Sequence, residues 1–361
     1  MTGRERFIGA IERTPIDRVP RSDAFWEETQ NEYGKSAAEL SEEFDFDTVM
    51  LALDNSMRFP TKKIDLGKQE EIWDRYGFHA KRNKGRSTLG YLEFATADPD
   101  DWEKYKDQFK VDKDGESRVV RDSFFLRTEP APDWKTAVQQ MNEATEKSGK
   151  FRMINFYGPL EGTWRHHGLE NTLADLIAEP EMIDDMFDRV TNVSLEALSY
   201  ALELGLKVDG IWLVEDLGST RAPLFSPEHY RKLLKPYHRK IFGFCREHGI
   251  RSIMHSCGDV SAFIPDLIDA GLDVLQSLQA NTTLNVVELK KKYGDRLSFM
   301  GNISVRKMAE GGDAIRTEME KVRLAKEGGG YIYHSDHSIP PEVTYEKYCD
   351  VMRILDEVGR Y

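Results

Sequence analysis

Cysteine is scarce in this chain, which has three cysteines among 361 residues. Three thiols do not make a disulfide framework, so the fold has to rest on a hydrophobic core. The sequence contains no run of 18 apolar residues, which argues against a membrane-spanning helix. Its charged N-terminus lacks the pattern of a secretory signal. The simplest expectation is therefore a protein of the reducing cytoplasm.

Basic residues are also fewer than acidic residues. The chain has 50 Lys and Arg against 63 Asp and Glu, a formal net charge of −13, and no long basic run. This balance argues against a nucleic-acid partner. A hydrophobic content of 40% and a charged content of 31% are those of an ordinary globular protein, and a chain of this length can bury a large core.

Short apolar segments alternate with amphipathic stretches along most of the chain. Helical patterns lie between most of these segments, which indicates parallel strands joined by right-handed crossovers. Eight such units predict a (β/α)8 TIM barrel. A doubly wound open sheet is the alternative, but no glycine-rich dinucleotide fingerprint follows any strand. The eight expected strands lie near residues 20, 49, 154, 212, 254, 275, 299 and 332.

Residues 58–150 interrupt this alternation. The stretch is polar and aromatic, with a hairpin pattern around Tyr76-Gly77 and a further strand pattern over residues 88–94. It lacks the pattern of a parallel sheet. We therefore expect one barrel domain over residues 1–361, with an insertion or lid over 58–150 after the second strand.

Polar side chains follow nearly every expected strand, at the end where TIM barrels carry their chemistry. A full ring of such residues is hard to explain by packing alone. The residues are Asp23, Asp54, Tyr157, Glu161, Glu215, Asp216, His255, Cys257, Gln276, Gln279, Asn302, His334, Asp336 and His337.

His255 and Cys257 are the most informative pair in this ring. They are two residues apart at the exit of a strand, so both side chains point to the same face. An imidazole and a thiolate together are typical zinc ligands. An isolated His-x-Cys is more often a hydrogen-bonded histidine beside a buried thiol, but a second histidine-rich strand exit begins at His334. This context favours a metal site.

His337 is the first choice for the third ligand, because it lies in the loop beyond the last strand, where its ring can reach back over the barrel. Asp336 and His334 are the alternatives. Three protein ligands leave a fourth tetrahedral position open, as in a catalytic zinc site. Glu215 and Asp216 are candidates for a further ligand, a partner of a ligand, or a base.

Tyr157 is expected to line the pocket with Trp164, His166 and His167, although an ordinary helix face explains the last three equally well. Cys245 and Cys349 fall on expected outer helices and are more typical of small core residues.

Several segments of the chain resemble the uroporphyrinogen decarboxylase superfamily. This set of (β/α)8 barrels includes the zinc- and cobalamin-linked methyltransferases. The resemblance covers nearly the whole chain outside the insertion and is strongest from residue 209 onward. It is carried by residues 17–20, 157–159, 255–273, 300–303 and 337–343.

The resemblance points to the methyltransferase branch. True decarboxylases of the superfamily carry an Arg-Gln-Ala-Gly-Arg-Tyr segment near the first strand, where residues 21–26 here are Arg-Ser-Asp-Ala-Phe-Trp. Asp54 does match the decarboxylases' central acid. The methyltransferases have His-x-Cys-Gly at the fifth strand, matched here by His255 and Cys257. Their third zinc ligand is a cysteine at the last strand's exit, where this chain has His337.

The resemblance implies a zinc-dependent methyltransferase. We expect it to move a methyl group between a small molecule, either a thiol or a methoxylated compound, and cobalamin or a corrinoid protein. Zinc, a corrinoid, the small-molecule donor or acceptor and a homodimer partner are the expected associates. Glu215, Asp54 and Tyr157 are the candidate catalytic residues. The alternative is a metal-independent decarboxylase or lyase that uses Asp54.

Overall fold

The computed structural model describes residues 1–121 and 129–361. An eight-stranded sheet organises the fold, in the order β12-β11-β10-β9-β8-β7-β1-β6. Its strands are parallel except β6, which pairs antiparallel with β1 at the edge. They are β1 (Thr48–Leu53), β6 (Val119–Val120), β7 (Phe151–Tyr157), β8 (Gly210–Val214), β9 (Arg251–Ser256), β10 (Val274–Ser277), β11 (Ser298–Gly301) and β12 (Tyr331–Ile332).

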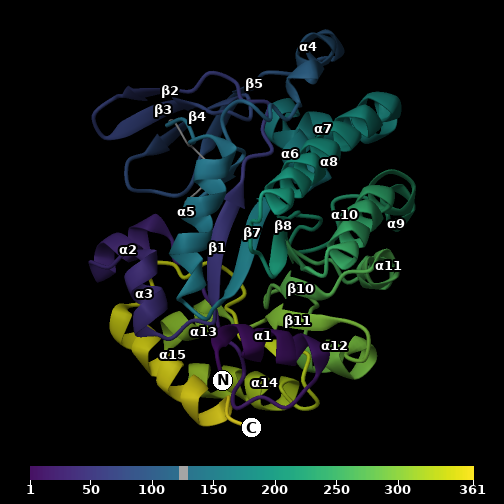
Figure 1. The fold of residues 1–361 in the computed structure, drawn as a ribbon. Coiled ribbons are helices and arrows are strands. Elements are labelled where there is room, and N and C mark those ends of the chain that lie inside the picture. Colours follow the sequence, from purple (N-terminus) through teal and green to yellow (C-terminus); the bar gives the residue numbers. More distant parts are fainter. Residues whose placement is uncertain (122–128) are drawn as a thin grey trace.

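Helices connect the parallel strands and lie around the outside of the sheet (Figure 1). Proline occupies the first turn of α6, α8 and α10, a position where its missing N–H costs nothing. The helices around the sheet are α5 (Trp134–Glu146), α6 (Pro159–His167), α7 (Leu169–Ala178), α8 (Pro180–Glu203), α9 (Pro227–His229), α10 (Lys235–Glu247), α11 (Ile264–Ala270), α12 (Val286–Tyr293), α13 (Val305–Glu310), α14 (Gly312–Ala325) and α15 (Tyr345–Val358).

The predicted first strand, near residue 20, forms isolated backbone bridges instead of a regular strand. The Tyr333 N–H donates to the Pro20 carbonyl, and the Ser22 N–H donates to the Tyr333 carbonyl. On the other side, the Asp47 N–H donates to the Arg21 carbonyl. Proline has no N–H to donate, which shortens the ladder. These bonds link β12 to the start of β1, so the (β/α)8 architecture predicted from the sequence is confirmed.

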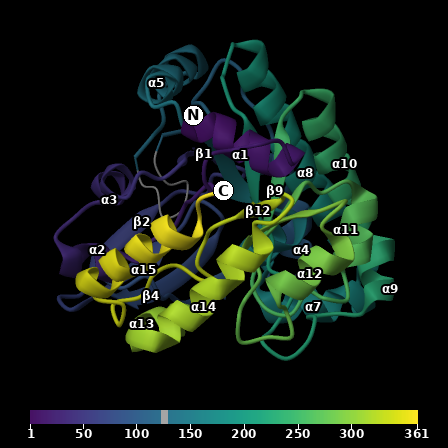
Figure 2. The ribbon, with the colours of Figure 1, turned by 90° about the horizontal axis from the view of Figure 1, so that it is seen from below.

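The N-terminal helix α1 (Gly3–Glu12) lies across the end of the barrel where the strands begin (Figure 2). Its Phe7 stacks on Phe151 of β7 with ring centroids 4.2 Å apart. Phe7, Ala10 and Ile11 share a buried cluster with inward-facing residues of five strands. The remaining N-terminal helices are α2 (Glu27–Tyr33) and α3 (Ala37–Glu43).

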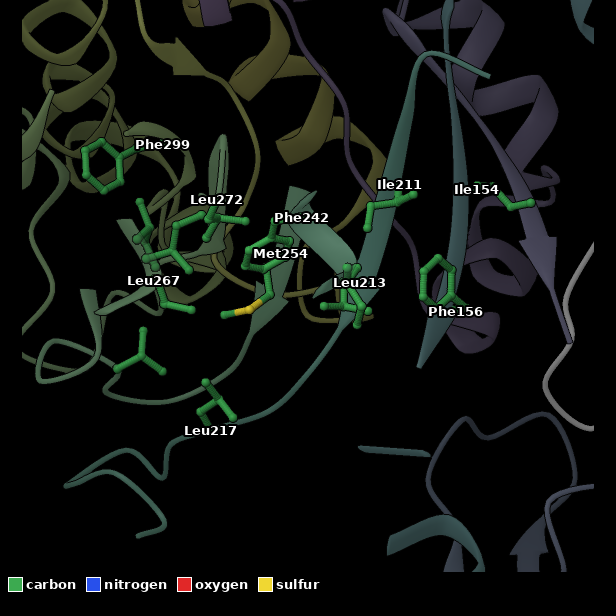
Figure 3. Packing of buried hydrophobic residues seen from close by; sticks show 14 of the residues in the cluster. Ile154, Phe156, Ile211, Leu213, Leu217, Phe242, Met254, Leu267, Leu272 and Phe299 are labelled. Carbon is green, nitrogen blue, oxygen red and sulfur yellow. The ribbon is translucent and has the colours of Figure 1, made fainter. Parts of the chain in front are cut away.

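The main core lies between the outer face of the sheet and the helices. Alternate residues of neighbouring strands, such as Ile211 and Leu213 of β8, point toward the helices, where they join Phe242 and Leu267 (Figure 3). The intervening residues point into the barrel. The strand pattern thus separates an outer apolar face from an inner face that carries the polar side chains of interest.

A second, four-stranded antiparallel sheet follows β1, in the order β2-β3-β4-β5. It lies at the end of the barrel opposite α1 (Figure 1). The hairpin expected around Tyr76-Gly77 joins its two middle strands. The elements are β2 (Lys62–Asp65), β3 (Gln69–Trp73), β4 (Phe78–Asn83), β5 (Gly90–Phe94) and α4 (Pro99–Tyr105).

The second sheet packs on the barrel through Tyr76 and Phe78, which are buried with Ala52, Val120 and Tyr157. Residues 122–128 of the predicted insertion lie outside the described residues, and the division into one domain with an insertion over 58–150 stays a prediction. Within the described part of the chain, no helix combines the length and apolarity needed to cross a membrane.

Candidate metal centre

Three potential metal donors converge at the ends of two neighbouring strands. His255 lies on β9, Cys257 follows it directly, and Asp216 lies two residues beyond the end of β8. Their ligand atoms lie within 4.8 Å of one another, and no other such group occurs in the described residues. Val214 of β8 is the register partner of His255, so the strand pairing itself brings the two exits together.

The spacing of these donors fits a tetrahedral metal ion. His255 Nε2 lies 3.4 Å from Cys257 Sγ and 3.5 Å from Asp216 Oδ1. Around a tetrahedral zinc ion, ligands at the usual bond lengths are about 3.4–3.6 Å apart. An imidazole, a thiolate and a carboxylate are also the donor types that zinc accepts. The residues present therefore fit such an ion.

The backbone N–H of Cys257 fixes the Asp216 carboxylate beside that residue. The Cys257 N–H donates to Asp216 Oδ1 over 2.7 Å. The group is nevertheless open to solvent, since 39% of the Asp216 side chain and 21% of the His255 side chain are exposed. A small molecule therefore has access to the position between the donors.

The electrostatics at His255 favour a cation. Burial by itself lowers the pKa of this imidazole, but the Cys257 sulfur, the Asp216 carboxylate and the Gln276 amide outweigh it and raise that pKa to about 10. The raised pKa shows that these neighbours stabilise positive charge between them. A metal ion placed there gains from the same groups.

His337, the third ligand expected from the sequence, lies outside this group. Its ring is tilted against Trp26, with centroids 5.6 Å apart, and its Nδ1 lies 3.3 Å from the Ser338 carbonyl oxygen. The structure thus brings His255 and Cys257 together and adds Asp216, which the sequence had offered only as a further ligand or base. The set His255, Cys257 and His337 stays a prediction.

The two alternatives to His337 have other partners. Both oxygens of Asp336 accept backbone N–H groups, from Ala280 and Val305, each over 2.9 Å. His334 is buried, and its Nδ1 lies 2.7 Å from the Ser335 carbonyl oxygen and 3.3 Å from the Gln276 amide nitrogen. Each of these residues therefore stabilises the loop or the barrel interior.

Glu215, a candidate catalytic residue from the sequence, anchors a helix. It is fully buried, and its two oxygens accept the N–H groups of Leu160 and Glu161 in the first turn of α6. His238 Nε2 lies 3.0 Å from the same carboxylate. A methyl group at Gly158 would collide with it. A carboxylate in this place offsets the partial positive charge at the N-terminus of α6.

Asp54, the candidate acid of the decarboxylase alternative, lies in an ion cluster. Its carboxylate is 1% exposed, accepts from Ser56, and lies 3.3 Å from Arg58 Nε and 3.5 Å from Arg75 Nε. Burial raises the pKa of Asp54, but Arg118, Arg75 and Arg58 together hold it below its usual value. The group is therefore an ion-pair partner of arginines.

Tyr157 packs at the barrel mouth against an arginine. The Arg165 guanidinium lies 4.5 Å from the Tyr157 ring centroid and pairs with Glu161. Burial raises the pKa of Glu161 to about 7, with Arg165 opposing the rise and Asp216 adding to it. Glu161 was one of the polar strand-exit residues in the sequence. Its burial could not be inferred there, because it depends on how α6 packs.

The comparisons with known proteins agree with this architecture. The family model described as Uroporphyrinogen decarboxylase (URO-D) matches residues 161–358. A uroporphyrinogen decarboxylase of Thioalkalivibrio sulfidiphilus is 24% identical over 259 residues, 67% of this chain and 70% of that protein. The methylcobamide:CoM methyltransferase MtaA of Methanosarcina barkeri is 28% identical over 179 residues, 48% of this chain and 49% of its own length.

A solved structure has the same fold. A methyltransferase from Methanosarcina mazei superimposes with a TM-score of 0.64 at 16% identity, covering 99% of both chains. At this identity the likeness shows the fold alone. The chain spans about half the length of MtaA, so that relative's activity is not transferred by similarity alone. The relatives are enzymes of two kinds, decarboxylases and methyltransferases.

Proposed function

We propose, from the premise that this chain belongs to the uroporphyrinogen decarboxylase (URO-D) family, that it is a zinc-dependent methyltransferase. The methyl group passes between a small molecule, either a thiol or a methoxylated compound, and a cobamide that is free or carried by a partner corrinoid protein. His255, Cys257 and Asp216 hold the zinc ion in this proposal.

The observation that carries the proposal is the convergence of nitrogen, sulfur and oxygen donors at tetrahedral spacing. Three protein donors leave one position for a reactant, which is the arrangement of a catalytic zinc site. When bound, zinc supplies Lewis acidity, which stabilises a thiol as its thiolate or polarises an ether oxygen. Support comes also from MtaA, whose name describes methyl transfer between a cobamide and a thiol cofactor.

The chain's own residues bind and orient the reactant. The Cys257 N–H holds the Asp216 carboxylate in place. Trp212 of β8 lies parallel to the His255 ring, with centroids 6.1 Å apart and an interplanar angle of 18°, and gives the site an apolar wall. The Trp212 ring thus offers apolar contact to a small reactant.

The test is zinc content combined with turnover. Cys257→Ala and Asp216→Asn each remove one donor, and we expect zinc affinity to fall by more than about 100-fold, beyond the range seen for residues that only support a ligand. Demethylation of methylcobalamin by a small thiol should fall in the same two variants. The measurements are zinc per chain after purification without chelators, and the loss of the methylcobalamin absorption band.

Cys245→Ala is the matched control, because Cys245 is a buried thiol on α10 that belongs to the main core. It should keep its zinc. His337→Ala separates the two candidates for the third ligand. Retention of zinc in His337→Ala and loss in Asp216→Asn supports the set proposed here. Loss of zinc in His337→Ala and retention in Asp216→Asn would instead identify His337 as the third ligand. A wild-type protein that binds no zinc after reconstitution sinks the proposal.

The decarboxylase alternative is less well supported by the geometry. It assigns the chemistry to Asp54, whose carboxylate is buried and occupied by Ser56, Arg58 and Arg75. The family includes decarboxylases, so this alternative keeps a direct test in the Asp54 variant described in the Discussion.

A further inference from the structure

We propose that Gln276 is a positioning residue that fixes the ring of His255 so that Nε2 is presented to the metal ion. The inference rests on the proposed zinc site and adds to it the residue that orients one of its ligands.

The contact between the two side chains follows from strand pairing. Gln276 of β10 is the register partner of His255 of β9, so both side chains project from adjacent strands at the same level of the barrel. The His255 Nδ1–H donates to Gln276 Oε1. This bond commits Nδ1 to carrying the proton, which leaves the lone pair of a neutral imidazole on Nε2. Nε2 is the atom that faces Cys257 and Asp216.

Burial makes this bond decisive for the ring's orientation. Gln276 is 1% exposed and His334 is 4% exposed, so water does not readily replace the amide as the partner of Nδ1. A buried donor left without a partner is destabilising. The amide oxygen therefore favours one ring orientation and one tautomer over the others.

His334 lies beside the other end of the amide. Gln276 Nε2 lies 3.3 Å from His334 Nδ1, which in turn lies 2.7 Å from the Ser335 carbonyl oxygen. The Ser335 N–H and hydroxyl both donate to Asp23 Oδ1, over 2.7 Å and 2.5 Å. The chain of contacts thus runs from the N-terminal segment, through the end of the barrel's last strand, to His255.

Trp212 restrains the two histidines from the opposite side. Its ring centroid lies 6.1 Å from that of His255 and 5.9 Å from that of His334. With Gln276 on one side and Trp212 on the other, rotation of the His255 ring is restricted. Metal-binding histidines generally need such a partner on their second nitrogen, and losing it costs 10–100-fold in metal affinity or activity.

The experiment compares Gln276→Met with Gln276→Glu. Methionine fills a similar volume without an acceptor for the Nδ1–H, so zinc affinity, measured by competition with a chromophoric chelator, should fall about 10–100-fold. Glutamate keeps an acceptor oxygen, so affinity should stay within a few-fold of wild type. Melting of each metal-free variant reports folding separately. Equal affinity in Gln276→Met and wild type overturns the proposal, as does an equal loss in both variants.

A second measurement needs no variant at Gln276. In the zinc-loaded wild-type protein, long-range ¹H–¹⁵N NMR of the histidine rings should show a proton on Nδ1 of His255 and the metal on Nε2, with the resonance assigned by its absence in His255→Ala. A proton on Nε2 overturns the proposal. If the wild-type protein binds no zinc, the proposed function fails as a whole. If it binds zinc while the Gln276 tests fail, only the positioning role is lost.

Discussion

At the scale of single residues, burial separates the polar side chains that can meet a reactant from those that hold the fold. Asp216 and His255 keep partly exposed side chains, whereas Glu215 and Asp54 are buried and fully engaged. All four come at strand exits in the sequence. Position at a strand exit therefore identifies candidate functional residues. Packing then determines which of them stay exposed enough to meet a reactant.

Asp54 gives a prediction of this kind. Asp54→Asn removes the negative charge while Arg58, Arg75 and Arg118 stay beside it, and breaking a buried ion pair in this way costs about 3–5 kcal/mol. We expect urea denaturation to show a loss of unfolding free energy of that order, with methyl transfer per folded molecule unchanged. The physical reason is that the three arginines, which hold the pKa of this carboxyl low, lose their anionic partner.

The control for Asp54 is Asp65→Asn. Asp65 pairs with Lys84 over 2.5 Å at the surface, with 70% of its side chain exposed, and such pairs contribute little to stability. A folded Asp54→Asn protein that has lost all turnover while keeping wild-type stability would point to the decarboxylase alternative instead.

The third metal donor shows where residue-level prediction from the sequence stops. His255 and Cys257 follow from their spacing on one strand, because alternation fixes their common face. Asp216 comes from the neighbouring strand, and its closeness to Cys257 depends on the register between β8 and β9 and on one backbone hydrogen bond. His337 was favoured for its place in the loop beyond the last strand, without knowledge that Trp26 lies against its ring.

At the scale of elements, helix α6 shows how a sequence pattern can suggest the wrong surroundings. His166 and His167 were expected to line a pocket or an ordinary helix face, and both are fully buried. His166 stacks on Trp102 with centroids 5.6 Å apart, and its Nδ1 lies 2.7 Å from the Thr96 hydroxyl. These partners come from the region after the second sheet, so the sequence pattern of α6 itself does not indicate that His166 is buried.

The buried imidazole of His166 predicts a pH dependence of stability. Burial holds the pKa of His166 well below its usual value of 6.5. Between these two pKa values the unfolded chain binds more protons than the folded one. The free energy of unfolding therefore rises with pH up to about 6.5 and decreases as the pH is lowered from there. His166→Phe should flatten this slope by up to about 1.4 kcal/mol per pH unit.

Denaturant unfolding of His166→Phe at several pH values between 5 and 7 is the check. His248→Phe serves as the control, because it removes an exposed imidazole by the same substitution. An unchanged slope in His166→Phe would contradict the assignment of acid sensitivity to this helix.

The strands were easier to predict than the helix environments. Seven of the eight predicted strands are regular, because apolar runs bounded by helical patterns specify buried parallel strands. The segment near Pro20 has the composition of a strand, yet proline removes one ladder hydrogen bond, and the segment forms isolated bridges, such as that of Arg21 with Tyr333, and a hydrogen bond to Asp47. How many residues of such a segment form a regular strand depends on the neighbouring strands in the barrel.

At the scale of the whole molecule, the candidate metal centre and the core are separate structures. The donors project from the ends of β8 and β9, and the apolar clusters fill the space between sheet and helices and the end closed by α1. The alternation of strand residues produces this division, because it sends one set outward and the other inward. The sequence could not predict how the second sheet sits over the barrel, which depends on contacts such as Tyr76 with Tyr157.

This separation predicts that removal of the metal leaves the fold intact. The donors contribute no apolar surface to the main core, so dialysis against a chelator should preserve the far-ultraviolet circular dichroism and a cooperative melting transition. Adding zinc back should raise the free energy of unfolding by about 2.7 kcal/mol at a free zinc concentration 100 times Kd. Asp216→Asn should show the same fold and a much smaller increase. Unfolding on chelation would instead identify a structural zinc, whose binding energy is part of the folding energy.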